Sequence, residues 1–384
     1  MNLNHDDLQT LGMTELTKVV QTMFDDESVQ VETWTSKPLQ GGTVGLVYEV
    51  CGTCSRSRTH ESAATDGAGE PVRSVKEPSA GREPGHNWAA VLKIQKPFAR
   101  FGDPESWRRE MRLYQSDVYD YLPRAVKVPR CYRIEEKDGT IWMWMEKMTG
   151  RNGTQLSLDD YALIARHLAH FQGAFVTGKP LPSQPWLSTQ YWLVHTSADW
   201  ATRAIPWLEP NGERQKDPLL SEETVRDAQW LWVERDRLLD VFHTLPRTLC
   251  HRDFSAGNVF TSKDARGMEQ TAVIDWDCAG IGRVGEDIAD LVGEALIFYD
   301  FEPAQAALLQ ETVLSSYISG LREANWKGDE RLIRQGYAIS FTLHWCFRIA
   351  SRIRKLEDRE ARQRYASVLS FVAGQAAPMR DMMA

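Results

Sequence analysis

The residues of this chain that could carry out chemistry are concentrated in residues 249–277, LCHRDFSAGNVFTSKDARGMEQTAVIDWD. Asp253 stands on an expected turn, Asn258 follows five residues later, and Asp275 comes at the end of an apolar run. The first carboxylate can accept a proton from a hydroxyl group, and the other two side chains offer the hard oxygen ligands that Mg²⁺ prefers. Phosphoryl transfer from ATP needs little more, because the protein mainly positions groups and neutralises charge.

The sequence between Asn258 and Asp275 predicts how these two side chains meet. Residues 259–260 and 271–274 are short β-prone segments on either side of a polar turn. A hairpin made from them would return Asp275 to the neighbourhood of Asn258. A purely structural interpretation is open for each residue alone, with Asp253 as a helix cap, Asn258 in a turn and Asp275 at a strand end. The joint pattern favours the chemical interpretation.

This segment resembles the aminoglycoside phosphotransferase and choline kinase family, whose fold is related to that of protein kinases. Members typically carry His-Gly-Asp, then Asn five residues after the Asp, then Ile-Asp-Trp/Phe and a later Asp-Ile-Ala. The matching residues here are His251-Arg252-Asp253, Asn258, Ile274-Asp275-Trp276 and Asp287-Ile288-Ala289. Arg252 departs from the family's glycine and is closer to the protein-kinase form. The resemblance extends over about residues 40–291.

The resemblance implies an α+β, bilobal protein kinase-like fold, with a small β-rich N-terminal lobe and a larger, mainly helical C-terminal lobe. The order of strand-like and helix-like segments along the chain agrees with this division. We place the ATP-binding lobe at residues 1–147 and the catalytic and substrate-binding lobe at residues 148–384. Residues 55–87 are rich in Ser, Gly, Pro and charge. We expect them to form a disordered insertion between the second and third strands of the first lobe.

A glycine cluster in the first lobe is the candidate phosphate-binding loop. Gly41, Gly42 and Gly45 stand between two β-rich runs, where the backbone can turn tightly and approach a phosphate. No Gly-Lys-Ser/Thr follows, so this is not a Walker motif. An ordinary hairpin turn is the alternative interpretation.

Lys93 lies inside an apolar, strand-like run. The resemblance implies that it holds the α- and β-phosphates and pairs with a glutamate on the next helix. Residues 104–122 have helical spacing and contain the best candidate, Glu110, with Glu105 as a rival. The alternative for Glu110 is a solvated position with local ion pairs to neighbouring arginines.

The connection between the lobes follows the apolar run 141–145. The resemblance implies that adenine meets backbone groups here, which makes Glu146 and Met148 the hinge residues. Farther along, helices are expected over residues 159–175, 219–243, 303–324, 339–355 and 360–374. The aromatic-rich stretch 183–200 either walls a substrate pocket or belongs to the core of the second lobe.

The resemblance also implies a role for each residue of the catalytic segment. Asp253 would orient the acceptor hydroxyl and accept its proton, while the two oxygen ligands would hold Mg²⁺ on the phosphates. His251 would hold the loop through packing and a hydrogen bond. Arg252 would either pair with a nearby carboxylate or touch a phosphate. Asp287 would bind the backbone of the loop.

Composition limits the other possibilities. The chain has 384 residues and a formal net charge of −8, which gives no basic footprint for nucleic acid. No apolar run is long enough to span a membrane, and the polar, acidic start argues against a signal peptide. Six scattered cysteines, with a single Cys-x-x-Cys at 51–54, indicate reduced thiols and a cytoplasmic protein.

Three functions remain as hypotheses. The first is a kinase that phosphorylates a hydroxyl group of a small molecule, such as an aminoglycoside or other antibiotic, an amino alcohol or a sugar. The second is a protein kinase, but the metal motif is Asp-Trp-Asp rather than Asp-Phe-Gly, and too few residues follow it for a peptide-docking loop. The third is an inactive ATP-binding scaffold, but the acid, the metal ligands and the lysine are all present.

Overall fold

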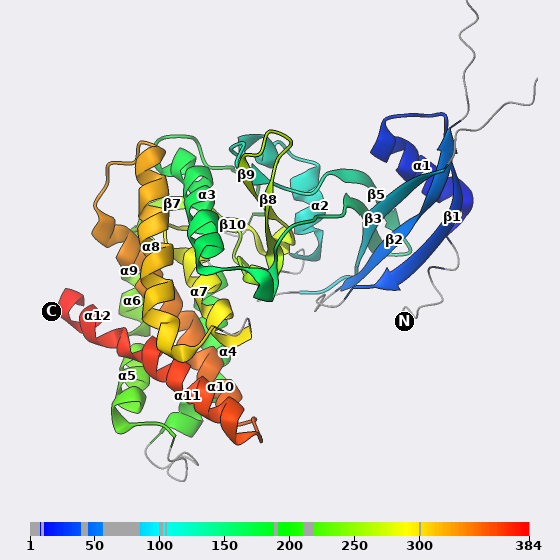
Figure 1. The fold of residues 1–384 in the computed structure, drawn as a ribbon. Coiled ribbons are helices and arrows are strands. Elements are labelled where there is room, and N and C mark those ends of the chain that lie inside the picture. Colours follow the sequence, from blue (N-terminus) through cyan, green and yellow to red (C-terminus); the bar gives the residue numbers. More distant parts are fainter. Residues whose placement is uncertain are drawn as a thin grey trace, which may run out of the picture. The chain divides into compact units, whose positions relative to one another are not determined.

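The computed structural model of the chain describes residues 8, 11–39, 45–56, 85–99, 103, 106–187, 191–209, 219–298 and 301–383 (Figure 1). Its contacts divide the chain into two compact units. Unit 1 comprises residues 1–97 and 129–147, and unit 2 comprises residues 98–128 and 148–384. The sequence-based division places residues 98–128 in the first lobe, whereas the contacts group them with unit 2.

Unit 1 is built on a five-stranded sheet of order β1-β2-β3-β6-β5, in which neighbouring strands are antiparallel. Helix α1 (Met13–Phe24) packs against β1 and β5. Its buried side chains, among them Leu16 and Val20, join Leu92 and Trp144 from the sheet in one apolar cluster. The strands are β1 (Val29–Pro38), β2 (Gly45–Arg56), β3 (His86–Gln95), β5 (Cys131–Lys137) and β6 (Thr140–Glu146).

The polar insertion lies between the second and third strands of this sheet, as the sequence predicts. Its expected ends are too wide, because β2 continues to Arg56 and β3 already begins at His86. Ser55 is buried and pairs with Gln30 across the β1–β2 ladder. Residues 57–84 lie outside the described part of the chain.

Unit 2 is mainly helical, with short strands near the loop of residues 251–258. Helices α3 and α8 lie side by side (Figure 1). Two glycines allow this approach, because a Cβ on Gly173 would meet Ala324 Cβ at 2.5 Å and one on Gly320 would meet Arg166 O at 2.6 Å. The helices are α2 (Arg109–Tyr114), α3 (Leu158–Val176), α4 (Tyr191–Leu208), α5 (Glu222–Val233), α6 (Arg235–Thr244), α7 (Glu286–Phe298), α8 (Ala306–Glu323), α9 (Glu330–Phe341), α10 (Phe347–Ile353), α11 (Arg359–Gly374) and α12 (Ala376–Met383). The strands are β4 (Val126–Lys127), β7 (Arg247–Cys250), β8 (Val259–Lys263), β9 (Glu269–Val273) and β10 (Gly280–Arg283).

Several expected helices are interrupted. The predicted helix over residues 104–122 is instead a 3₁₀ turn (Ser106–Arg108), the short α2, and a second 3₁₀ turn (Val118–Tyr121). Ser116 explains the break, because its hydroxyl bonds to Leu113 O and Val118 N and so competes with the helical pattern. Residues 219–243 divide into α5 and α6, and residues 339–355 contain a π-helical turn (Thr342–Cys346). The other predicted helices are confirmed.

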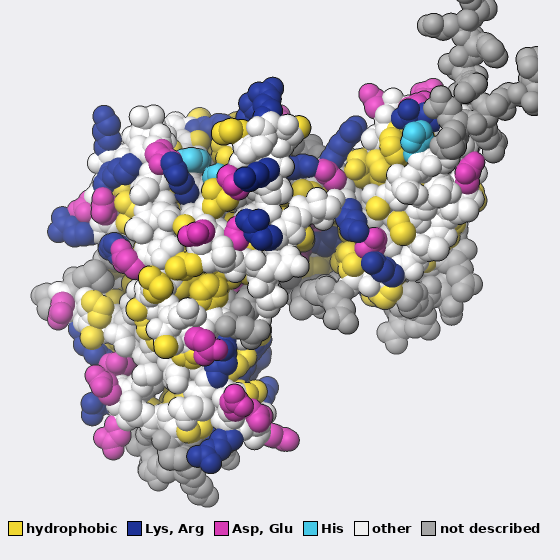
Figure 2. Space-filling model, viewed as in Figure 1, with side chains coloured by type: hydrophobic (Ala, Val, Ile, Leu, Met, Phe, Trp, Pro, Cys, Tyr) yellow, Lys and Arg dark blue, Asp and Glu magenta, His cyan; other side chains and the backbone are white. Residues whose placement is uncertain are grey.

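The surface carries charges of both signs. On the face drawn in Figure 2, the Lys and Arg side chains of the described residues are interspersed with Asp and Glu. Among the described helices, none combines the length and the apolar composition that crossing a bilayer requires. The α+β class, with a β-rich N-terminal part and a larger helical part, is confirmed.

A buried carboxylate fixes the start of α3. Ser157 and Asp160 form a capping box, in which Asp160 N donates to Ser157 Oγ (3.2 Å) and Ser157 N donates to Asp160 Oδ2 (2.9 Å). Asp160 also accepts hydrogen bonds from Arg151 Nε (3.0 Å) and Thr261 Oγ1 (3.1 Å). One side chain therefore joins α3 to β8 and to the segment after Met148.

We predict that Asp160→Ala lowers the free energy of unfolding by about 2 kcal/mol, because the cap and two further hydrogen bonds are lost together. Burial raises the pKa of Asp160, but the hydrogen bonds from Arg151 and Ser157 outweigh it and hold that pKa well below its usual range. The contribution is therefore present above about pH 4 and lost as the pH falls. Urea denaturation at pH 7 and at about pH 2.5 measures both effects.

Asp159→Ala is the matched control, because Asp159 lies in the same helical turn but is exposed. We expect it to cost less than about 1 kcal/mol. Equal losses in the two variants would contradict the role given to Asp160.

Candidate active site

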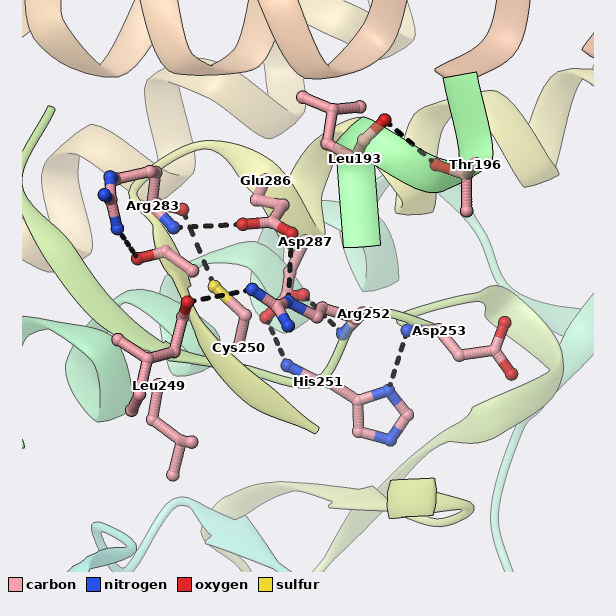
Figure 3. A network of polar contacts seen from close by, with 12 residues as sticks. Leu193, Thr196, Leu249, Cys250, His251, Arg252, Asp253, Arg283, Glu286 and Asp287 are labelled. Atoms are coloured by element: carbon pink, nitrogen blue, oxygen red, sulfur yellow. Dashed lines mark hydrogen bonds and ion pairs between the residues drawn. The ribbon is translucent and has the colours of Figure 1, made fainter. Parts of the chain in front are cut away.

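The loop of residues 251–258 is held by the first turn of α7. It follows β7, whose last residues Leu249 and Cys250 are fully buried. Asp287 accepts hydrogen bonds from His251 N (2.9 Å) and Arg252 N (2.8 Å), one on each carboxylate oxygen (Figure 3). The expected role of Asp287 in binding the backbone of this loop is thus confirmed.

Asp287 is buried on all sides and receives a third hydrogen bond from Gln172 Nε2 (2.8 Å). Burial raises its pKa to about 7, although the backbone N–H groups of Arg252 and His251 lower it. These donors are what make a buried carboxylate tolerable here, since an ionised group without partners would be strongly unfavourable. The position of the loop therefore depends on the Asp287 carboxyl group, in which burial and hydrogen bonding act on the pKa in opposite directions.

His251 connects the loop to the β8–β9 hairpin. Its ring is fully buried and packs edge-on against Trp276, with ring centroids 4.7 Å apart. Nε2 lies 2.9 Å from Ile274 O, and Nδ1 accepts a hydrogen bond from Asp253 N at 3.3 Å. These partners define a neutral ring protonated on Nε2. The predicted packing and hydrogen-bonding of His251 are both present.

Arg252 adopts a left-handed backbone conformation, with φ 65°. This conformation costs a residue with a side chain roughly 1–2 kcal/mol, whereas glycine takes it freely. Its buried guanidinium pairs with Glu286, with Nε 3.1 Å from Oε1, and donates from Nη2 to Ile281 O (2.8 Å). Of the two partners considered for Arg252, the structure shows the carboxylate.

Asp253 is oriented by Asn258. The side-chain amide of Asn258 donates to Asp253 Oδ2 (3.0 Å) and to Asp253 O (2.9 Å). Figure 3 shows the Asp253 carboxylate directed away from the buried network around Arg252 and Asp287. Because the amide nitrogen of Asn258 points to Asp253, the amide oxygen is the atom that could bind a metal ion. Such an oxygen fits Mg²⁺.

The hairpin brings Asp275 back to Asn258, as predicted. Strands β8 and β9 pair with Val259 opposite Val273, and Ile274 N donates to Asn258 O (2.9 Å). Asp275 then adopts a left-handed conformation, with φ 65°. A carboxylate and an amide oxygen on adjacent strand ends form a donor set of the type that Mg²⁺ takes in phosphoryl-transfer sites.

Glu110 is fully buried on α2, so the alternative of a solvated helix residue is excluded. Its Oε1 accepts a hydrogen bond from Trp276 N (3.3 Å), the residue after Asp275. Lys93 lies in the middle of β3 in unit 1, opposite Val47 and Met143. The Lys93–Glu110 pair stays a prediction, and Glu105 lies outside the described residues.

Two of the other nucleotide-binding candidates, Gly45 and Glu146, lie at strand ends of the sheet of unit 1. Gly41 and Gly42 lie outside the described residues. Gly45 opens β2, and a Cβ there would come within 2.7 Å of Ile94 O. Glu146 closes β6, where its N–H donates to Arg130 O (2.7 Å). Met148, the next candidate, is half-buried and starts the second segment of unit 2.

Sequence reasoning missed three residues that support the loop. Asn152 Nδ2 donates to Ala256 O (3.0 Å), Gly257 O (2.8 Å) and Val259 O (2.8 Å), which fixes the turn before β8. Gln172 bonds to Asp287, and Glu286 pairs with Arg252. The signal that could have pointed to Gln172 is its place on an otherwise apolar face of α3.

Comparison with known proteins identifies the family. Residues 81–325, more than half of the chain, match the family described as "Phosphotransferase enzyme family". The chain belongs to this phosphotransferase family. A search of the curated proteins finds no match to the phosphotransferase.

Solved structures show the same fold. A choline kinase from Cryptosporidium parvum Iowa II is 11% identical, with a TM-score of 0.53, and the match covers 96% of this chain and 97% of that chain. The GDP complex of aminoglycoside 2'-phosphotransferase-IIIa is 16% identical, with a TM-score of 0.50, over 95% and 99% of the two chains. The phosphotransferase therefore has the kinase-like fold that the sequence predicts.

We predict that replacing Arg252 by the family's glycine destabilises the phosphotransferase by about 2–4 kcal/mol. Backbone strain of about 1 kcal/mol is relieved, but the Glu286 carboxylate is left buried without its guanidinium. The double variant Arg252→Gly/Glu286→Gln should recover much of the loss. Urea denaturation followed by tryptophan fluorescence compares the three proteins. If the double variant is no more stable than the single one, the loss does not come from a buried Glu286 carboxylate without a partner.

Proposed function

We propose that this phosphotransferase moves the γ-phosphoryl group of ATP to a hydroxyl group of a small molecule. The observation that carries the proposal is the Asp253 carboxylate, held by Asn258 beside the strand end that bears Asp275. A carboxylate next to two oxygen ligands is the arrangement that phosphoryl transfer to an alcohol needs.

Each residue of the loop has a proposed role. Asp253 orients the acceptor hydroxyl and takes its proton. Asn258 and Asp275 would hold Mg²⁺, which would neutralise charge on the phosphates when bound. His251 and Arg252 touch no reacting atom in this proposal. They position the loop through the hydrogen bond to Ile274 and the ion pair with Glu286.

The nucleotide is proposed to contact unit 1. Lys93, paired with Glu110, would bind the α- and β-phosphates, and the loop of Gly41, Gly42 and Gly45 would cover them. The backbone at Glu146 and Met148 would meet the adenine. A cytoplasmic location is part of the same proposal, and it is supported by the absence of a disulfide among the six cysteines, all of which are described.

The segment after the metal ligand favours a small acceptor over a peptide. Every residue from 276 to 284 is buried. Strand β10 occupies part of this span and pairs with β7, Gly280 opposite Cys250. A peptide substrate needs an exposed docking loop here, and this chain uses the span as core. The protein-kinase hypothesis is therefore disfavoured.

Incubation with ATP and Mg²⁺ and a panel of aminoglycosides, amino alcohols and sugars tests the proposal. Mass spectrometry should detect an acceptor that gains one phosphoryl group, and EDTA should abolish the gain. We predict that Asp253→Asn lowers kcat by roughly 10²–10⁴-fold while nucleotide binding is kept, because only the proton acceptor is lost. An Asp253→Asn protein with unchanged turnover would remove this residue from the reaction.

We predict that Lys93→Ala raises the KM for ATP and lowers kcat, because the phosphates lose a cation. Lys18→Ala is the control, since Lys18 is exposed on α1 of the same unit. ATP titrations of turnover give both constants. If the two variants behave alike, Lys93 does not bind the phosphates.

A further inference from the structure

Helix α7 continues beyond the catalytic loop with a second set of acidic side chains. Asp287, Asp290 and Glu294 are spaced by three and four residues, so they share one face of the helix. At 1.5 Å per residue, Glu294 lies about 10 Å along the helix from Asp287.

The helical segment after α9 supplies the partners of these acids. Its π-helical turn, Thr342–Cys346, places His344 Nε2 3.9 Å from Asp290 Oδ1. One turn later, Arg348 Nη1 lies 3.3 Å from Glu294 Oε1 and donates to His344 Nε2 at 3.2 Å. π-Helical turns often occur at functional sites, because they shift side chains out of the regular helical register.

Two arginines of this segment stack on aromatic rings. The Arg348 guanidinium lies over Trp345 (4.5 Å), Phe298 (5.5 Å) and Trp200 (5.9 Å). Arg352 lies over Phe298 at 4.7 Å. We call these five residues the arginine–aromatic cluster. Trp200 belongs to the aromatic-rich stretch whose role the sequence left open between pocket wall and core.

The charge of the cluster is positive. Burial raises the pKa of Asp290 well above its usual range, and Glu294 and Asp253 raise it further. Burial lowers the pKa of His344 well below its usual range. The cluster contributes two guanidinium groups, and Glu294 is the carboxylate that pairs with Arg348. Burial raises the pKa of Glu294 as well.

The cluster reaches solvent, and it shares α7 with Asp287, which binds the catalytic loop. Phe298 is 38% exposed and the Arg348 side chain 20% exposed. Arg348 Nε is buried and has no hydrogen-bond partner among the described residues.

We propose that the arginine–aromatic cluster binds an anionic group of the acceptor, so that this enzyme phosphorylates a hydroxylated carboxylate rather than a cationic amine. The inference rests on the proposed function, because it names the acceptor class of the same reaction. Arginine presents a planar fork of donors that matches a carboxylate in two parallel hydrogen bonds. The aromatic faces that would attract an ammonium group already carry the enzyme's own guanidinium groups.

Two sets of matched acceptors test the inference. The first is glucose, glucosamine and glucuronate, and the second is glycerol, 2-amino-1,3-propanediol and glycerate. Within each set the number of carbon atoms is the same, and one group is replaced by an amine or by a carboxylate. We expect the acid to have the highest kcat/KM for ATP-dependent phosphorylation, at least about 10-fold above the amine.

Arg348→Gln should lower kcat/KM for the acid by about 10- to 100-fold, mainly through KM, because a charge-assisted hydrogen bond is lost. Arg348→Lys keeps the partner of Glu294 and should lose less, which separates anion binding from misfolding. Arg354→Gln is the control, since Arg354 is an exposed residue at the end of the same helix. It should leave all constants unchanged.

The outcomes separate the inference from the function on which it rests. If the amine or the neutral member is the best acceptor and turnover needs Asp253, the proposed function stands and the inference fails. If no compound is phosphorylated, the proposed function fails for these acceptors, and titration of tryptophan fluorescence still tests the cluster. If the acids bind more tightly than the amines and Arg348→Gln weakens that binding, the inference is supported. If acids and amines change the fluorescence equally, the inference is overturned.

Discussion

The structure of the catalytic loop depends on one buried carboxylate. Asp287 holds the N–H groups of His251 and Arg252 on its two oxygens and takes a third hydrogen bond from Gln172. A short loop with no regular hydrogen bonding would otherwise sample many conformations, at a cost of about 1–2 kcal/mol per ordered residue. Fixing two successive backbone groups from a rigid helix removes most of that freedom. Asp253 follows directly, so its direction is set by the same contact.

Two residues in left-handed backbone conformation complete the geometry of the candidate site. Arg252 and Asp275 both have φ 65° and neither is glycine. Arg252 is held there by Glu286 and by its hydrogen bond to Asp287. Asp275 is followed by Trp276, whose N–H is bound by Glu110. Non-glycine residues in this conformation persist only where the surroundings determine them, and they are frequent at functional sites.

The sequence could predict the parts of this site that depend on local pattern. The hairpin that returns Asp275 to Asn258 follows from alternating β-prone segments around a polar turn, and the structure has it. The role of Asp287 followed from the resemblance to a known family. The sequence could not predict that Glu286 pairs with Arg252, because two adjacent acids at a helix start are equally suitable as caps.

The errors in the predicted secondary structure also come from local features that the sequence pattern does not show. Periodicity predicted a helix through residues 104–122, but the hydroxyl of Ser116 diverts the backbone after α2. Periodicity also missed the π-helical turn, because one extra residue per turn changes the pattern only locally. In both cases a few specific hydrogen bonds outweigh a propensity that is worth only tenths of a kcal/mol per residue.

Helix α7 joins the loop of residues 251–258 to the residues proposed to bind the acceptor. Its first turn carries Glu286 and Asp287, which fix the loop, and its later turns carry Asp290 and Glu294, which face the segment around Arg348. The first turn thus holds the loop, and the later turns carry the residues proposed to bind the acceptor. Such a division explains why the catalytic segment is easily recognised in the sequence and acceptor specificity is not. The residues proposed to bind the acceptor lie on helices whose sequence pattern indicates only burial. The structure shows what the pattern does not, because it brings Arg348 and its aromatic neighbours against α7.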